Sequence, residues 1–241
     1  MSKRVIFTQG GKGGVGKTTL AVSLVEWFRA QKKSVQILDF DVENEEASGL
    51  KCFIPEAVKF NIHREGSLDA IFDILDDKGA DVLIIDQAAA SGEPTFRWFE
   101  DMAEAATTEG ISFTAIGVVT GDPGSVQALL KWADKLQDNV DYLVALNQMN
   151  DPEEDFNSWN TDASAHEFRE AFNPAVLTMK SRLPEFEELL RTSGHTLGQV
   201  VAGKVTGKLA WARWKLRAKG YQTALNTGFD DVADFLLPNK K

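Results

Sequence analysis

Short apolar runs alternate along this chain with longer stretches in which apolar residues recur every three or four positions. The short runs predict strands near residues 4–9, 35–40, 81–86, 112–119, 141–147 and 175–180. The helical spacing predicts helices over residues 17–31, 67–76, 94–107, 124–137, 164–172, 184–191, 205–225 and 229–237. Strands that alternate with helices form βαβ units, so we expect an α/β fold. It would be one domain over residues 1–241, with a doubly wound, mostly parallel sheet flanked by helices.

The composition agrees with a single domain. The chain has 241 residues, of which 43% are hydrophobic, enough to fill a sizeable core. No apolar run approaches the roughly 20 residues that span a bilayer, and the N-terminus reaches a charged loop too early for a secretory signal. Cys52 is the only cysteine, which excludes disulfides and cysteine-held clusters within the chain. We therefore expect a cytoplasmic protein, associated with the nucleoid if it binds DNA.

A glycine-rich loop lies between the first predicted strand and the first predicted helix. Gly11, Gly16, Lys17 and Thr18 fit the pattern G-x-x-x-x-G-K-[ST] in the required order of strand, loop and helix. Such a loop directs backbone N–H groups and a helix N-terminus at a phosphate group. Lys17 would bridge the terminal phosphates, and the Thr18 hydroxyl would bind Mg²⁺. The expected nucleotide-binding residues are Gly11, Gly13, Gly14, Val15, Gly16, Lys17, Thr18 and Thr19.

Lys12 makes this loop more specific. The run from Lys12 to Thr18, Lys-Gly-Gly-Val-Gly-Lys-Thr, resembles the deviant Walker A motif of the ParA/MinD superfamily, which are SIMIBI-like P-loop ATPases. The resemblance implies ATP and Mg²⁺ as cofactors. It also implies a homodimer in which two ATP molecules are sandwiched and Lys12 reaches the partner's nucleotide to neutralise phosphate charge. A solvated lysine on a loop is the alternative.

Two further predicted strands end in carboxylates. Asp39 and Asp41 share one face of an extended chain, and Asp86 ends the apolar run Val82 to Ile85. By resemblance to the superfamily, Asp39 and Asp86 would hold Mg²⁺ through its water, and Asp41 would orient the attacking water. The residues after Asp41 and after Asp86 differ from the superfamily's common sequences. Ordinary strand-end aspartates are the alternative.

Two residues are candidates for binding the base. Asn147 ends the predicted strand 141–147 and corresponds to the superfamily's asparagine on the adenine edge. Pro184 follows the strand near 175–180 and resembles the proline that begins the base-covering loop. A turn-forming asparagine and a proline in the first turn of a helix are the alternatives.

Charge is distributed unevenly. The net charge is −10, yet residues 189–229 carry +7 with no acidic residue, which leaves −17 for the rest of the chain. Lys204 lies just before the predicted helix 205–225. If the helix includes it, Lys204 would lie within about 60° around the helix axis of Lys208, Lys215 and Lys219, beside an apolar stripe. A basic stripe on an acidic protein suits nonspecific DNA, and a solvated helix face is the alternative. The DNA-binding candidates are Lys204, Lys208, Arg213, Lys215, Arg217 and Lys219.

The resemblance implies a slow Mg²⁺-dependent ATPase that partitions or positions a plasmid or another cargo. Its ATP-bound dimer would bind nonspecific DNA or a cargo adaptor, and hydrolysis, stimulated by a partner protein, would reset it. The alternative is a conjugal-transfer accessory ATPase that acts as a nucleotide-gated interaction switch without DNA. Membrane binding ranks lower, because acidic residues lie near the C-terminus. A third possibility is a metabolic or metal-delivering P-loop enzyme, which would turn over a small substrate quickly. The lack of a cysteine pair argues against the iron–sulfur and metal-carrying branches.

Overall fold

The computed structural model describes residues 2–9, 13–40, 49–62, 66–77, 79–88 and 91–239. Gly11, Lys12 and Asp41, which belong to the expected nucleotide site, lie outside these ranges.

The chain forms one parallel sheet, as expected. Its strand order is β3-β2-β4-β1-β5-β6-β7, and every neighbouring pair is parallel. The strands are β1 (Lys3–Gln9), β2 (Val35–Asp39), β3 (Val58–Lys59), β4 (Val82–Asp86), β5 (Ile111–Val119), β6 (Asp141–Asn147) and β7 (Ala175–Met179). The sequence pattern did not predict β3, because a strand of two residues is too short to show a periodicity.

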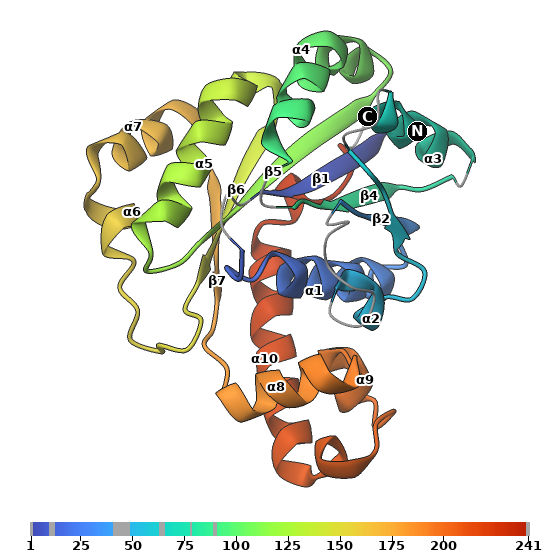
Figure 1. Cartoon of the computed structure of the whole chain (residues 1–241), viewed down its shortest axis with the longest axis vertical. Helices are drawn as coiled ribbons and strands as arrows, with labels where there is room; N and C mark the ends of the chain where they lie inside the picture. The colour runs from blue at the N-terminus through green and yellow to red at the C-terminus, as the bar shows by residue number, and fades with distance from the viewer. Residues whose placement is uncertain are drawn as a thin grey trace.

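Helices cover both faces of the sheet (Figure 1). The α-helices are α1 (Lys17–Ala30), α2 (Leu50–Phe53), α3 (Ala70–Asp77), α4 (Gly92–Thr108), α5 (Pro123–Leu136), α6 (Asn157–Thr161), α7 (Ala163–Phe172), α8 (Pro184–Ser193), α9 (Leu197–Val201) and α10 (Ala212–Asp231). Short 3₁₀ helices are η1 (Ser67–Asp69), η2 (Gln137–Asn139), η3 (Gly207–Ala210) and η4 (Ala233–Phe235). Among the described helices, none combines the length and hydropathy needed to cross a membrane.

Side chains that alternate along each strand enter two separate cores. On β1, Val5 and Phe7 pack in the core beneath helices α3–α7, whereas Ile6 packs with α1 and α8–α10. Each strand therefore contributes apolar groups to both sides, which is why the central strands are almost continuously hydrophobic. Figure 1 shows the lower end of the molecule, formed by α8, α9 and the first turns of α10, projecting beyond the sheet.

The helices predicted at 205–225 and 229–237 are wrong in their bounds. Gly203 and Gly207 have φ angles of 70° and 60°, which are left-handed and break a helix here. Trp211 is extended, and α10 then runs without a break to Asp231, because Leu225 and Phe229 lie one turn apart and are both buried. Lys204 and Lys208 are therefore not on α10, and the single stripe of four lysines does not exist.

A buried arginine closes the amino end of the sheet. Arg4 of β1 has no exposed surface, and its guanidinium donates to Asp141 (2.7 Å), Thr114 (2.6 Å), the Phe235 carbonyl (3.0 Å) and Asn239 (2.7 Å). These bonds tie β1, β5 and β6 to the C-terminal segment after α10. The sequence analysis did not identify Arg4, because its partners are far away along the chain.

We expect Arg4→Met to lower the free energy of unfolding by roughly 3 kcal/mol, because it removes the four hydrogen bonds that the buried guanidinium donates. Urea unfolding measures the change. The matched control is Arg29→Met, which removes an exposed ion pair with Glu56 and should cost less than about 1 kcal/mol. Equal losses in the two variants would contradict the role of Arg4.

Candidate functional site

The phosphate-binding loop joins β1 to α1, and its described part starts at Gly13. Gly14 and Gly16 have φ angles of 79° and 102°, in the left-handed region that favours glycine. Gly16 is the N-cap residue of α1, and a Cβ atom there would overlap with the amide nitrogen of Asn147. This close approach lets the start of α1 point its unpaired N–H groups into the loop, as an anion site requires.

Helix α1 is held on two sides. Leu20 and Leu24 are fully buried against the sheet. On the opposite side, the Glu26 carboxylate accepts hydrogen bonds from the Thr196 hydroxyl and from the Gly198 N–H (3.0 Å) at the start of α9. Burial raises the pKa of Glu26, and these two hydrogen bonds partly oppose that shift. The helix that carries the loop is thus joined to α9.

Three polar side chains form a row across the carboxyl ends of neighbouring strands. Asp86 of β4 lies in register with Thr8 of β1 and with Asp39 of β2. The Thr8 hydroxyl donates to one Asp86 oxygen (2.7 Å), and the Thr18 hydroxyl of α1 donates to the other (2.8 Å). The structure therefore brings Thr18, Asp39 and Asp86 together at the loop, as the sequence analysis expected.

Burial dominates the electrostatics of this row. Desolvation raises the pKa of Asp86 from 3.8 to about 6, and the negative charge of Asp39 acts in the same direction. The hydroxyls of Thr8 and Thr18 and the positive charge of Lys17 oppose the shift. Among the described residues, Lys17 is the positive charge that acts on Asp86, and Asp39 adds a second buried negative charge, so the site gains from a further positive charge.

The segment after β4 is anchored by the Gln87 side chain. Its amide nitrogen donates to Thr95 of α4 (3.2 Å), and its carbonyl oxygen accepts from the Ser91 hydroxyl. All three side chains are buried. The sequence analysis noted only that the residues after Asp86 differ from the superfamily's common sequences, whereas the structure shows that Gln87 holds the start of α4 close to Asp86.

Asn147 makes contacts with the loop itself. Its amide nitrogen donates to the Val15 carbonyl (2.8 Å) and contacts the sulfur of Met149 (3.1 Å). Its amide oxygen accepts from the Met149 N–H (3.1 Å). Asn147 therefore connects the carboxyl end of β6 to the phosphate-binding loop.

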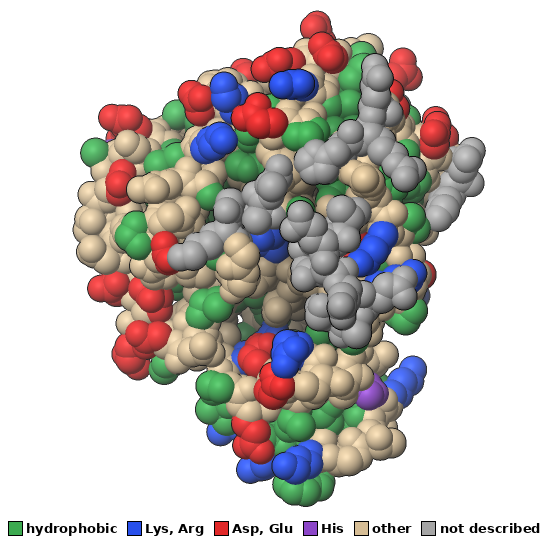
Figure 2. Space-filling view, in the orientation of Figure 1, with side chains coloured by type: hydrophobic (Ala, Val, Ile, Leu, Met, Phe, Trp, Pro, Cys, Tyr) green, Lys and Arg blue, Asp and Glu red, His purple; other side chains and the backbone are tan. Residues whose placement is uncertain are grey.

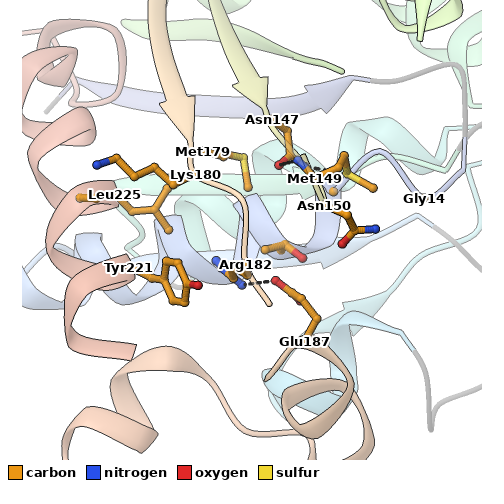
Figure 3. Close-up of a pocket in the computed structure, with 13 residues that line it drawn as sticks. Gly14, Asn147, Met149, Asn150, Met179, Lys180, Arg182, Glu187, Tyr221 and Leu225 are labelled. Atoms are coloured by element: carbon orange, nitrogen blue, oxygen red, sulfur yellow. Dashed lines mark hydrogen bonds and ion pairs between the residues drawn. The ribbon is translucent and has the colours of Figure 1, made fainter. Parts of the chain in front are cut away.

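A cavity of about 250 Å³ adjoins Asn147 (Figure 3). Gly14, Gly16 and Thr19 of the loop and α1 line one side, and residues of the segment after β7 and of α10 line the other. Pro184 is the first residue of α8 and does not line this cavity. It lines a neighbouring cavity of about 370 Å³, which shares the lining residues Thr19, Asn150, Arg182 and Glu187 with the first cavity.

The six basic residues proposed to bind DNA are all exposed, but they do not form the single stripe that the sequence predicted. On α10, Lys215 and Lys219 lie on one flank of the buried Trp214–Ala218 stripe, and Arg213 and Arg217 lie on the other. Lys204 and Lys208 precede the helix, Lys208 within η3. In Figure 2 the lower tip of the molecule shows basic, acidic and exposed hydrophobic side chains side by side, and further acidic side chains gather over α4–α7.

Arg213 already contacts other side chains of this surface. Its guanidinium donates to Glu185 (3.0 Å) and lies 4.3 Å above the Trp214 ring and 5.4 Å from that of Trp211. Trp214 is buried, whereas Trp211 is 51% exposed and Leu216 is 72% exposed. Trp214 is therefore a core residue, whereas the ring of Trp211 is available on the surface.

The sequence analysis missed several residues that line the site. Thr8 was the detectable one, because a hydroxyl near the end of an apolar strand predicts a polar contact there. Arg182 and Tyr221 line the cavity of about 250 Å³, but they come from a loop and a distant helix and follow no motif.

Comparisons with solved structures give the fold. The chain matches the MinC:MinD cell division protein complex of Aquifex aeolicus with a TM-score of 0.56 and 13% identity, over 100% of this chain and 99% of that one. It matches the MinD cell division protein of the same organism with a TM-score of 0.54 and 12% identity, over 99% and 100%. A search of curated proteins finds no significant match.

The sequence of residues 6–191 matches the family described as the CobQ/CobB/MinD/ParA nucleotide binding domain. The match spans β1 through α8, including the phosphate-binding loop and the row formed by Thr8, Asp39 and Asp86. The chain therefore belongs to the CobQ/CobB/MinD/ParA nucleotide-binding family.

Proposed function

We propose that this protein is an Mg²⁺-dependent ATPase whose ATP-bound homodimer binds nonspecific DNA or a cargo adaptor and is reset by slow hydrolysis. Its role would be the partition or positioning of a plasmid or another large cargo. The observation that carries the proposal is the row of Thr8, Asp39 and Asp86, to which Thr18 is bonded at the start of α1.

The donor set suits Mg²⁺. Thr18, Asp39 and Asp86 supply hydroxyl and carboxylate oxygens, which are the hard ligands that this ion prefers. Within the described residues, no cluster of three or more acidic, histidine or cysteine side chains could hold a metal on its own. An ion here would therefore depend on phosphate oxygens and water as well, which is how Mg²⁺ binds with nucleotides. When bound, it would neutralise charge on the phosphate groups.

The remaining catalytic roles follow from the superfamily resemblance. Lys17 would bind the terminal phosphates, and its buried side chain beside Asp86 supports that role. Asp41 would orient the attacking water, and Lys12 would contact the nucleotide of the partner subunit. Trapping the phosphates between two subunits would make dimer formation depend on ATP.

DNA binding is supported by the four exposed cations of α10. Lys215 and Lys219 on one flank and Arg213 and Arg217 on the other place basic side chains along both edges of the exposed face of the helix. On a chain of net charge −10, this local charge suits a phosphate backbone. Two such helices in a dimer would strengthen the attachment.

A second candidate is a nucleotide-gated switch that binds a partner protein. The exposure of Trp211 and Leu216 favours it, because phosphate contacts do not need exposed apolar side chains, whereas protein interfaces are rich in them. One of the matched structures is a complex of MinD with MinC, which supports a partner protein. Salt-sensitive retention on DNA that requires ATP would distinguish the first candidate from the second.

We expect Lys12→Ala to abolish ATP-dependent dimerisation while nucleotide binding persists. Light scattering after size exclusion, with a nonhydrolysable ATP analogue and Mg²⁺, should show a doubled mass for the wild type and a monomer for the variant. With ADP both should be monomers. Lys135→Ala, which removes an exposed lysine of α5, is the control and should still form the dimer. A dimeric Lys12→Ala would contradict the proposed contact between subunits.

The triple variant Lys208/Lys215/Lys219→Glu should lose DNA retention and keep the ATP-dependent mass. We expect at least about a tenfold loss of affinity at low salt, because each lost phosphate contact reduces the number of counterions that DNA releases on binding. A filter-binding titration at several salt concentrations measures it. The control, Lys32/Lys131/Lys135→Glu, changes the net charge equally at other exposed sites. If both triple variants lose DNA equally, the basic surface is not specific to α10.

We expect Asp86→Asn to stabilise the nucleotide-free protein and to remove its stabilisation by Mg²⁺ and ATP. The raised pKa means that the folded state takes up a proton as the pH falls through about 6, whereas the unfolded state does so near 3.8. Above pH 6 the ionised carboxylate therefore lowers the free energy of unfolding by up to about 3 kcal/mol. This cost becomes smaller as the pH falls toward 4.

Urea unfolding at pH 7.5, 5.5 and 4 measures this effect. The gain from Asp86→Asn should be largest at pH 7.5 and should vanish near pH 4, whereas Asp134→Asn at an exposed position should have little effect at any pH. A variant that is less stable than the wild type at pH 7.5 would contradict the desolvation argument.

A further inference from the structure

A second cavity lies between α1 and the helices α8 and α9. Its volume of about 370 Å³ falls within the roughly 300–1,000 Å³ of sites that bind small organic molecules. In Figure 1 this space lies between α1 and α2 and the helices α8 and α9 below them. It meets the cavity beside Asn147 at four shared residues, whereas Val22, Glu26 and Leu197 line this cavity and not the other.

Most of the wall of this cavity is apolar. Val22 of α1, Leu190 of α8 and Leu197 of α9 line it, and all three side chains are buried in the core on this side of the sheet. Phe53 of α2 also lines it and packs against the same core. Such a wall favours a ligand with a short hydrocarbon body, because that body leaves water when it binds.

The charged groups of the wall do not balance. Arg182 pairs with Glu187 at 3.0 Å, and Arg191 pairs with Glu188 at 2.8 Å. Glu26 is a third carboxylate of the wall, and within the described parts of the chain it forms no ion pair. The wall therefore has one carboxylate more than it has guanidinium groups.

Neutral donors hold the Glu26 carboxylate in place. It accepts hydrogen bonds from the Thr196 hydroxyl and from the Gly198 N–H (3.0 Å). A Cβ atom on Gly198 would overlap with a Glu26 oxygen, so glycine permits this close approach. Burial raises the pKa of Glu26, and its hydrogen bonds and the charges of Arg29 and Arg182 only partly oppose that shift. A negative charge is thus fixed at the wall of an apolar cavity.

A second polar group of the wall lacks a partner. The Nδ1 atom of His195 is buried and forms no hydrogen bond with any residue that the structure describes. Buried polar atoms in folded proteins are nearly always paired. An ammonium group has three N–H donors, enough for a carboxylate and for the acceptor nitrogen of a neutral imidazole. Glu26 and His195 therefore favour the same class of ligand.

We propose that this cavity binds a small organic cation, an ammonium group on a short aliphatic chain. The ammonium group binds Glu26, and the chain packs against Val22, Leu190 and Leu197. A metal-free inorganic cation would leave the apolar wall unused, and a neutral alcohol would leave the charge of Glu26 unpaired. The site goes beyond the proposed function, because it needs neither ATP nor a second subunit. Its ligand would contact α1, the helix that carries the phosphate-binding loop.

Amide NMR titration of the whole chain tests the proposal with three probes. They are n-pentylamine, n-pentanol, which has the same chain without the charge, and ammonium chloride, which has the charge without the chain. n-Pentylamine should shift the amide signals of residues 22–26 and 195–198 and saturate at roughly millimolar concentration, as expected for so small a ligand. It should bind at least about tenfold more tightly than either other probe, because only the amine gains both contacts.

Two variants separate the charge of Glu26 from its hydrogen bonds. Glu26→Gln keeps an acceptor for Thr196 and Gly198 but removes the charge. It should weaken the binding of n-pentylamine at least about tenfold and leave that of n-pentanol unchanged. Glu167→Gln removes an exposed carboxylate of α7 and is the matched control for the general attraction of cations to an acidic protein. It should bind n-pentylamine like the wild type.

The inference is wrong if n-pentylamine and n-pentanol bind equally, if Glu26→Gln and Glu167→Gln behave alike, or if residues 22–26 and 195–198 do not respond. Saturating ADP with Mg²⁺ should leave n-pentylamine bound, and its displacement would overturn the proposal by making the cavity part of the nucleotide site. If Glu26→Gln does not fold, the comparison of the three probes on the wild type decides. Failure of the wild type to bind ADP would instead contradict the proposed function and would not affect this site.

Discussion

The carboxyl end of the sheet depends on one buried carboxylate. Asp86 accepts hydrogen bonds from Thr8 of the central strand and from Thr18 of the loop helix, and it lies in register with Asp39 of the next strand. Because these groups come from three strands and a helix, any change in charge at Asp86 acts on all four elements. Burial makes the ionised form costly, so the site favours a partner that brings positive charge.

The opposite end of the sheet is held by Arg4 in a different way. Its two terminal nitrogens donate within the chain, to Asp141, Thr114 and the segment after α10. Removal of Arg4 would break these internal bonds and destabilise the fold, whereas the ionised Asp86 is itself a cost to the fold and can gain from a bound cation. The buried groups at the amino ends of the strands therefore stabilise the fold, whereas those at the carboxyl ends form the candidate binding site.

The sequence predicted the parts of this structure in which local pattern and tertiary packing agree. Strand β4 and the loop at Gly14 and Gly16 were predictable, because a continuous apolar run and glycines with left-handed angles have few alternatives. Asp39 and Asp86 were predictable from their positions at strand ends, although only the sheet order puts them side by side.

Other features depend on contacts that no local pattern carries. The helix predicted at 205–225 was wrong because Gly203 and Gly207 take left-handed angles that its apolar spacing did not indicate. Tyr221 lies in a helical stretch and looks like any half-buried aromatic residue until Phe186 and Arg182 are placed beside it. Long-range packing decides such positions, and it is visible only in the folded chain.

The central claim is that Mg²⁺ and ATP bind at the loop beside Asp86, and hydrogen–deuterium exchange tests it directly. With a nonhydrolysable ATP analogue and Mg²⁺, the account predicts slower amide exchange in residues 13–20 and at the ends of β2 and β4. Unchanged exchange in residues 13–20 at saturating nucleotide, or protection confined to the helices α4–α7, would contradict it.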